Sequence, residues 1–143
     1  MRHLPTLALL ALLPLNPALA ATPAARPSSP AAAAAEPIVQ EVMTRALPEY
    51  PGKEALILTV TYPPGGADPV HRHDAHGFVY VLEGRIVMGV AGGPEVTLGP
   101  GEAFHEGPRD LHTVGRNASQ TDPARFVVFL IKDADKPAVL PPH

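Results

Sequence analysis

Residues 71–84 read HRHDAHGFVYVLEG. Three of the chain's seven histidines lie within six residues here, and they are followed at once by an apolar run that ends at a glycine. Alternate residues of a strand face the same side of a sheet, so His71 and His73 are expected to project together. Two imidazoles placed in this way can bind one divalent ion through neutral nitrogens. The stretch therefore predicts a buried strand with a candidate metal-binding pair at its start.

The apolar runs around this stretch are short, rich in valine and bounded by glycine or proline. Runs with these ends and lengths indicate an antiparallel sandwich or barrel. In VAGGPEV (90–96), paired glycines allow the positive φ angles of a tight hairpin. The segment IVQEVMTRAL (38–47) comes nearest to a helical period, but it fits an edge strand equally well. We therefore predict an all-β fold with strands in ALILTVTY (55–62), FVYVLEG (78–84), RIVMGV (85–90), EVTL (95–98) and RFVVFLIK (125–132).

The first twenty residues have the composition of a secretory signal peptide. Residues 1–20 begin with a basic Arg2, continue with a run rich in leucine and alanine, and end in Ala-Leu-Ala. That run is too short to span a bilayer. We expect an exported protein, periplasmic or secreted, with no membrane insertion once the signal is cleaved.

The segments that flank the apolar runs are rich in proline. Residues 21–37 are almost entirely alanine, proline and serine, and they predict a tether without a fold of its own. Residues 134–143 are expected to form a loose C-terminal tail. The predicted barrel domain therefore covers residues 38–133.

Composition narrows the choice of partners. The chain has no cysteine, so an exported domain must be stabilised by its core, by oligomerisation or by a bound metal. It has 11 Lys and Arg against 14 Asp and Glu, for a net charge of −3. A weakly acidic chain does not favour nucleic acid or an anionic membrane surface. We expect a small-molecule ligand or substrate and no nucleic acid.

A third histidine follows the loop GPRDLH (107–112) beyond another β run. His112 is therefore the natural partner of His71 and His73. Burying three imidazoles without an ion would leave several hydrogen-bonding groups unsatisfied. A three-histidine site with open positions suits zinc, manganese, iron(II), cobalt or nickel, and the order of affinities does not choose among them.

These residues resemble the cupin family, whose members are small β-barrels with two motifs separated by a hairpin. The first motif, G-x5-H-x-H-x3,4-E-x6-G, is matched at Gly65, His71, His73 and Gly84, and the second, G-x5-P-x-G-x2-H-x3-N, at Gly101 and His112. Pro108 and Asn117 each stand one residue late, and Arg109 replaces the usual glycine. The resemblance covers roughly residues 50–132. It implies a double-stranded β-helix with metal ligands at the three histidines.

The predicted strand at 78–84 is apolar on both sides. Val79 and Val81 are expected to fill the barrel, while Phe78, Tyr80 and Leu82 cover its other face. A sheet that is apolar on both faces needs a second cover. Related cupins obtain that cover by dimerising, so the resemblance implies a homodimer.

One position departs from the family pattern in a way that affects the site. The cupin glutamate ligand would fall at Gly77, or at Phe78 with the longer spacing. His76 has the wrong strand parity to replace it, unless a bulge formed around Gly77 re-aims the imidazole.

Glu106 is the second candidate for the missing ligand. A carboxylate there could act as fourth ligand, fix a histidine tautomer or serve as a general base, although an exposed acid beside Pro108 is equally consistent with the sequence. His105 has the opposite parity, so only one of His105 and Glu106 is expected to face inward.

Two functions remain open from the sequence. The first is a metal-dependent enzyme acting on a small oxygen-rich or anionic molecule, because the resembling family includes dioxygenases, decarboxylases, isomerases and hydrolases. Glu106 is then the candidate catalytic residue. The alternative is a non-catalytic module that binds a small ligand or the metal itself through a degenerate cupin site. Glu106 pointing at the metal favours the enzyme, and Glu106 pointing to solvent favours the binding module.

Overall fold

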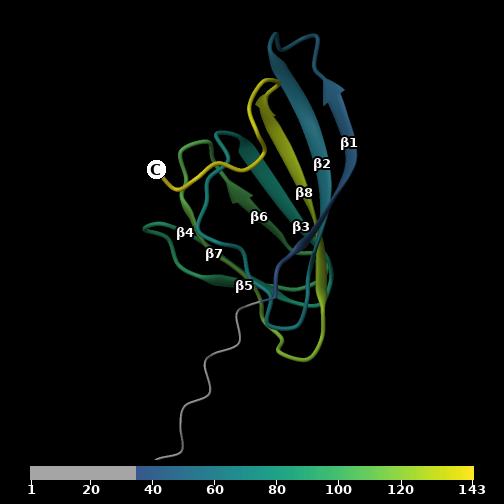
Figure 1. Ribbon diagram of the computed structural model, residues 1–143, viewed down its shortest axis with the longest axis vertical. Helices are drawn as coiled ribbons and strands as arrows, with labels where there is room; N and C mark the ends of the chain where they lie inside the picture. Colours follow the sequence, from purple (N-terminus) through teal and green to yellow (C-terminus); the bar gives the residue numbers. More distant parts are fainter. Residues whose placement is uncertain (1–34) are drawn as a thin grey trace, which may run out of the picture. The chain divides into compact units, whose positions relative to one another are not determined.

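The computed structural model describes residues 35–143, which form two antiparallel sheets packed around a common core (Figure 1). The larger sheet has the strand order β1-β2-β8-β3-β6, and the smaller has the order β5-β4-β7. The strands are β1 (Ile38–Ala46), β2 (Lys53–Tyr62), β3 (His76–Glu83), β4 (Ile86–Val90), β5 (Val96–Leu98), β6 (Ala103–Glu106), β7 (His112–Asn117) and β8 (Ala124–Asp133). The predicted signal peptide and residues 21–34 of the predicted tether lie outside the described residues.

The prediction of an all-β fold is confirmed. Each of the five apolar runs forms a strand, and the segment at 38–47 is the edge strand β1, which pairs only with β2. Strands β6 and β7 are additions that no apolar run predicts. The expected hairpin joins β4 to β5 and has Gly92 at a φ of 79°. No helix among residues 35–143 is long and apolar enough to cross a membrane.

The core lies between the two sheets and follows the alternation of the strands. On β8 the side chains of Phe126, Val128 and Leu130 are buried, while the residues between them are more exposed. Tyr62 packs edge-on against Phe126, with 4.9 Å between the ring centroids. Each fully buried side chain of this size contributes roughly 1.5–3 kcal/mol through removal from water. The smaller sheet closes the core with Ile86, Met88 and Leu98.

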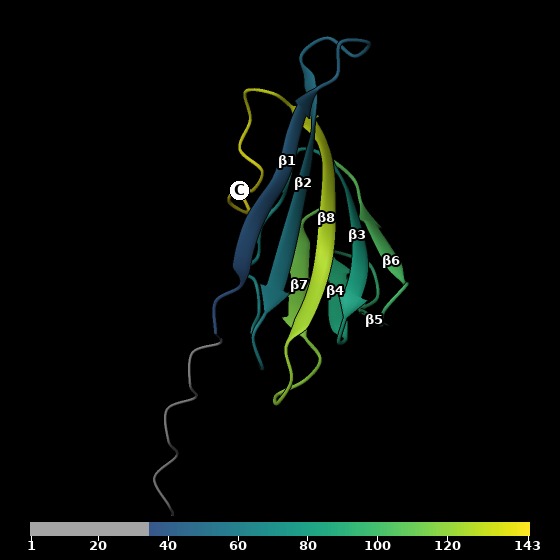
Figure 2. The ribbon, with the colours of Figure 1, turned by 90° about the vertical axis from the view of Figure 1, so that its right-hand side faces the viewer.

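The outer face of the larger sheet is also apolar, as the alternation of β3 predicts. Figure 2 looks onto this sheet and shows β1, β2, β8, β3 and β6 side by side. Phe78, Tyr80 and Leu82 of β3 are exposed to 43%, 49% and 37%. Phe78 stacks on Phe129 of the neighbouring strand at a centroid distance of 6.1 Å. Val79 and Val81 are buried on the opposite face, as expected.

The connection between β2 and β3 runs along β7. It brings His71 and His73 close to His112. His71 and His112 form an antiparallel bridge in which each backbone N–H donates to the other's carbonyl, at 3.1 and 2.8 Å. A second bridge joins Ala67 to Arg116. The loop thus places histidines 41 residues apart within contact distance.

The C-terminal segment differs from the loose tail that the sequence suggests. Leu140 and Arg72 exchange two backbone hydrogen bonds, at 2.8 and 3.1 Å. Ala138 packs against the core, and its carbonyl lies 2.5 Å from Nδ1 of His73. The backbone of Arg72 and the imidazole of His73 therefore supply the partners that hold this proline-rich stretch in place.

We predict that two glycines with similar φ angles differ in their tolerance of a methyl group. A Cβ at Gly84 (φ 71°) would lie 2.6 Å from the carbonyl oxygen of Pro123, whereas a Cβ at Gly92 (φ 79°) meets no described atom within 4 Å. Gly92→Ala should lower the free energy of unfolding by about 1 kcal/mol, the strain of a left-handed backbone. Gly84→Ala should lower it by a further 1–3 kcal/mol or so, because of the added overlap. Urea denaturation of both variants measures the difference, and equal losses would contradict the packing described here.

Candidate metal centre

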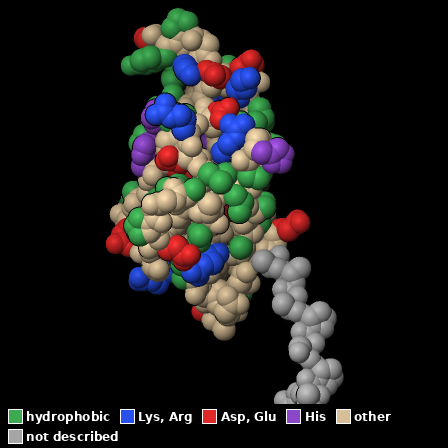
Figure 3. Space-filling view, turned by 90° about the vertical axis from the view of Figure 1, so that its left-hand side faces the viewer, with side chains coloured by type: hydrophobic (Ala, Val, Ile, Leu, Met, Phe, Trp, Pro, Cys, Tyr) green, Lys and Arg blue, Asp and Glu red, His purple; other side chains and the backbone are tan. Residues whose placement is uncertain are grey.

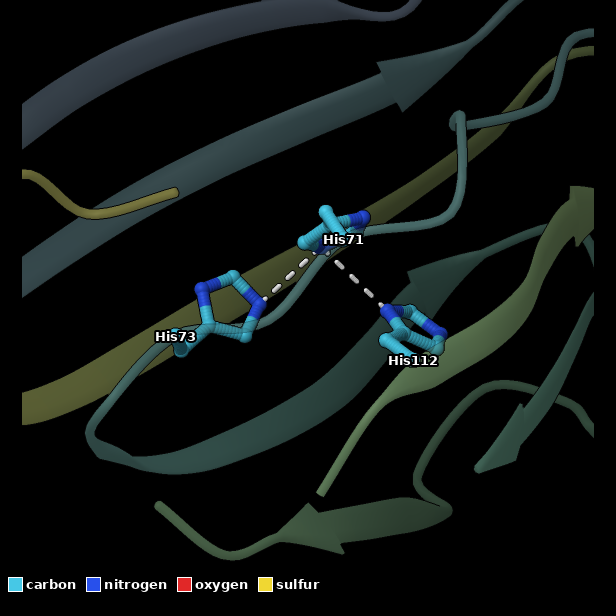
Figure 4. Close-up of side chains that lie close together, drawn as sticks. All are labelled: His71, His73 and His112. Carbon is cyan, nitrogen blue, oxygen red and sulfur yellow. Dashed lines mark hydrogen bonds between the residues drawn. The ribbon is translucent and has the colours of Figure 1, made fainter. Parts of the chain in front are cut away.

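Three buried histidines meet at one end of the barrel core (Figure 4). His71 and His73 come from the segment before β3, and His112 is the first residue of β7. Nε2 of His71 lies 3.1 Å from Nε2 of His73 and 3.4 Å from Nδ1 of His112. The exposed fractions of the three residues are 6%, 8% and 3%. The structure thus brings together the three residues that the sequence proposes as ligands.

Backbone carbonyls determine which ring nitrogens of two of these histidines carry hydrogen. Nδ1 of His71 lies 2.8 Å from the carbonyl oxygen of Pro69, and Nδ1 of His73 lies 2.5 Å from that of Ala138. A carbonyl oxygen only accepts, so each Nδ1 must donate. In the neutral form both Nε2 atoms are then bare acceptors that face each other at 3.1 Å. Such an arrangement requires a cation or a proton between them.

Glu106 brings a carboxylate to the same cluster. It is the last residue of β6 and is 2% exposed, whereas His105 is exposed on the other face, so the expected parity holds. Its Oε1 lies 3.3 Å from Nε2 of His73, and its Oε2 lies 3.6 Å from Nδ1 of His112. The sequence leaves the orientation of Glu106 open, and the structure turns it inward.

The four side chains form a closed ring of possible ligand atoms. Successive distances from His71 to His73, Glu106, His112 and back to His71 are 3.1, 3.3, 3.6 and 3.4 Å. Ligand atoms that share a zinc-like ion at about 2.0–2.2 Å are separated by roughly 3.0–3.6 Å. Within residues 35–143, Oε2 of Glu106 is buried without a hydrogen-bond partner on this ring. Nε2 of His112 is also buried and unpartnered, but Nδ1 is the His112 nitrogen that faces the cluster. The ligand atoms of the three histidines, which all lie within 4.8 Å of one another, therefore have the chemistry and spacing to hold a divalent metal ion, and Glu106 faces two of these histidines through different oxygens.

The protonation of the centre follows from burial and from these contacts. Burial favours the neutral form of His73, but the hydrogen bond and charge of Glu106 outweigh it and raise the pKa of the imidazolium. Burial likewise opposes ionisation of Glu106, yet the hydrogen bond from His73 and the nearby histidines lower its pKa. The pKa of His112 is lowered, because burial outweighs the attraction of Glu106. Both pKa shifts favour the ion pair in which His73 carries the proton and Glu106 is ionised.

His76 does not join the cluster. Its side chain is exposed, and its Nδ1 lies 3.3 Å from Nε2 of His105 on the outer face of β3 and β6. The two rings stack with centroids 5.6 Å apart. No bulge at Gly77 redirects His76, because Gly77 stays in register with both β6 and β8.

The sequence does not point to two further residues of the site, Tyr62 and Asp68. The hydroxyl of fully buried Tyr62 donates to Oδ2 of Asp68. Burial and the Asp68 carboxylate raise the pKa of Tyr62 above its usual range, so the phenol keeps its proton. Asp68 falls between Gly65 and His71 of the first motif, and only this position hints at its role.

The histidines line one side of a cavity of about 120 Å³ whose opposite wall is apolar. Leu58, Val60 and Val128 contribute to that wall from the larger sheet. Val39 of β1 and Val139 of the C-terminal segment also line the cavity, and both are more than half exposed. The polar lining residues are Asp68, His71, His73, Glu106 and His112. A small molecule in this cavity would contact both the cluster and aliphatic side chains.

Solved structures share this architecture. An oxalate oxidase in complex with the substrate analogue glycolate is 25% identical, with a TM-score of 0.55, and the match covers 73% of this chain and 54% of that one. The polyketide cyclase RemF from Streptomyces resistomycificus is 23% identical, with a TM-score of 0.56 and coverage of 73% and 70%. The DMSP lyase DddQ from Ruegeria pomeroyi is 24% identical, with a TM-score of 0.52 and coverage of 58% and 41%. The match thus spans about half of the oxidase and less than half of the lyase.

The family itself is shown by a match over just over half of the chain. None of the curated proteins compared with the chain matches it. The cupin domain model matches residues 58–130, a range that contains all three histidines, Gly77 and Glu106. Together with the two-sheet barrel and its buried histidine cluster, this match means that the chain belongs to the cupin family.

Proposed function

We propose that this chain binds one divalent metal ion through His71, His73 and His112 and holds a small anionic or oxygen-rich molecule against it. The observation that carries the proposal is the 3.1 Å distance between Nε2 of His71 and Nε2 of His73. Because Nδ1 of each ring donates to a backbone carbonyl, neither Nε2 carries a hydrogen in the neutral form. Two lone pairs at this distance repel unless a positive charge lies between them. The donors suit zinc, manganese, iron, cobalt or nickel equally well.

The shape and lining of the cavity support a small ligand. Its volume of about 120 Å³ and its apolar wall suit a compact molecule with a polar group at one end. The similar oxalate oxidase is described with glycolate, a small hydroxycarboxylate that is anionic and oxygen-rich. The match spans only about half of that oxidase, so its substrate serves as a guide to ligand class and not to the reaction.

A bound divalent ion would polarise an oxygen of the ligand and lower the pKa of a bound water. The chain itself supplies a proton acceptor at the cavity, because Asp68 lines it and is held in place by the Tyr62 hydroxyl. Glu106 points into the centre, the orientation expected of an enzyme, but both its oxygens face histidines. Asp68 is therefore better placed than Glu106 to take a proton from a bound molecule.

A non-catalytic module is the second candidate, and the scarcity of polar groups in the cavity favours it. Apart from the three histidines, Glu106 and Asp68, every residue that lines the cavity is apolar. Such a cup can retain a ligand without changing it. Turnover that is lost in Asp68→Asn with metal retained would distinguish the enzyme from the module.

We also propose export and a homodimer. Export is supported by the composition of residues 1–20, which lie outside the described residues. Dimerisation is supported by the outer face of β3, where three large apolar side chains are exposed in one row.

Positive and negative side chains are interspersed on the face in Figure 3, and this mixture of charges does not favour binding of nucleic acid.

We predict that the purified protein contains about one equivalent of a single divalent metal. His73→Ala should lose it, because the substitution removes one of the three imidazole donors. His76→Ala is the matched control, since it removes an exposed imidazole three residues away and should keep the metal. Elemental analysis after tag-free, chelator-free purification measures the content. A wild-type protein that neither contains metal nor takes it up would refute the proposal.

We predict a pH window for the stability that Glu106 and His73 contribute to the metal-free protein. The pKa of Glu106 is lowered from 4.5, so its contribution is complete above that value and is lost as the pH falls through the lower folded-state pKa. The pKa of His73 is raised from 6.5, so its contribution is complete below that value and is lost as the pH rises through the higher folded-state pKa. The contribution should therefore peak between about pH 4.5 and 6.5.

The measurement is the difference in unfolding free energy between wild type and Glu106→Gln, both stripped of metal, across pH 4 to 8 or so. Glu83→Gln, an exposed glutamate, should show no such window. A flat difference for Glu106→Gln would contradict the buried pair.

We predict that Tyr80→Glu converts a dimer in solution to a monomer, because it places a charge in the centre of the apolar row on β3. Tyr50→Glu, in the exposed turn between β1 and β2, is the control and should leave the dimer intact. Light scattering coupled to size exclusion gives the mass. A monomeric wild type, or a dimer that survives Tyr80→Glu, would show that this face is not the interface.

A further inference from the structure

Gly77 is a glycine that backbone conformation does not require. Among the described residues, the glycines with positive φ are Gly52, Gly65, Gly84, Gly92 and Gly101. Gly77 instead lies inside β3, paired to a strand on each side. A glycine within a strand costs stability and usually marks a close approach of other atoms. Space, and not a turn, must account for it.

The atoms that approach Gly77 belong to Glu106. A Cβ at position 77 would lie 2.9 Å from Cγ and 3.1 Å from Oε1 of Glu106, and 3.3 Å from Cδ2 of Leu130. Contacts under 3.0 Å between such atoms do not persist without displacement. Any side chain at 77 would therefore push the Glu106 carboxylate out of its present position.

The two positions are equivalent in their relation to the site. Gly77 and Glu106 are paired across the antiparallel strands β3 and β6. Directly opposed residues of such strands project from the same face, with Cβ atoms about 4.5–5.5 Å apart. A carboxylate moved from position 77 to position 106 thus reaches the same part of the barrel. Position 77 is where the family pattern has its glutamate, and this chain has the glutamate one strand away.

We infer that Glu106 is the fourth ligand of the metal centre, supplied by β6 in place of β3, and that Gly77 is glycine because it must make room for it. The inference rests on the proposed function, in which the three histidines bind an ion. A buried carboxylate with one oxygen unpartnered needs a cation nearby, and both oxygens of Glu106 already face histidines of the cluster. The centre is therefore complete, and the two carboxylate positions exclude each other.

The first test compares metal affinity, by competition with a chromophoric chelator, and the absorption spectrum of the cobalt form. Glu106→Gln keeps the size of the side chain but removes its charge, and it should weaken binding at least about tenfold and change the spectrum. Glu102→Gln, on the turn before β6, is the control and should bind as wild type does. Wild-type affinity and spectrum in Glu106→Gln would overturn the inference while leaving the three-histidine site intact. A wild type that binds no metal would instead refute the proposed function.

The second test transfers the carboxylate back. Glu106→Gly should lose affinity as Glu106→Gln does, and Gly77→Glu combined with Glu106→Gly should regain most of it, together with the wild-type cobalt spectrum. Gly77→Glu alone should be destabilised, because two carboxylates then compete for one space. A folded double variant that binds no better than Glu106→Gly would overturn the equivalence of the two positions.

A stability cycle tests the exclusion even if the transferred variant does not fold. Gly77→Ala should lower the urea midpoint of the metal-free protein in the wild-type background. In the Glu106→Ala background, where Cγ and Oε1 are gone, the same substitution should have little effect. Equal shifts in both backgrounds would show that Gly77 does not make room for Glu106, and would overturn the inference.

Discussion

The charge compensation between Glu106 and three buried imidazoles is the interaction on which the rest of this barrel depends. Four buried ionisable side chains meet beside the apolar core, and neighbouring members of the cluster are separated by 3.1–3.6 Å. Burial opposes the charged form of each, so the cluster persists only where opposite charges face each other. A proton on His73, beside ionised Glu106, satisfies this demand in part. A divalent ion held by the three histidines would supply the remaining positive charge.

The second constraint is that the ligand atoms are set by backbone groups remote in sequence. Pro69 and Ala138 each direct an imidazole by accepting from its Nδ1, so both Nε2 atoms face the cluster. Because Ala138 belongs to the C-terminal segment, the last residues of the chain control the tautomer of a ligand and also line the cavity through Val139. The orientation of His73 and the lining of the cavity therefore both depend on a segment that forms no named strand.

The cavity is lined by one group of polar side chains and one group of aliphatic side chains. The cluster, Asp68 and the Tyr62 hydroxyl gather at one end, and aliphatic side chains from β2, β8 and the C-terminal segment form the other. Asp68 is the acid that the cluster does not engage, which makes it the group that separates an enzyme from a binding cup.

The sequence by itself determined the fold class, the strands with strong alternation and the three histidines, because these depend on local period and spacing. Strand parity also favoured an outward His76, but a bulge at Gly77 stayed possible until the register of β3 with β6 and β8 excluded it. The sequence could not orient Glu106 or find Asp68, because parity is lost across the loops that precede them. Gly77 looked like a missing ligand until the β3–β6 register set it opposite Glu106. Only the tertiary structure decided that Gly77 and Glu106 occupy neighbouring positions. The sequence of a strand does not specify which distant strand it pairs with, or in which register.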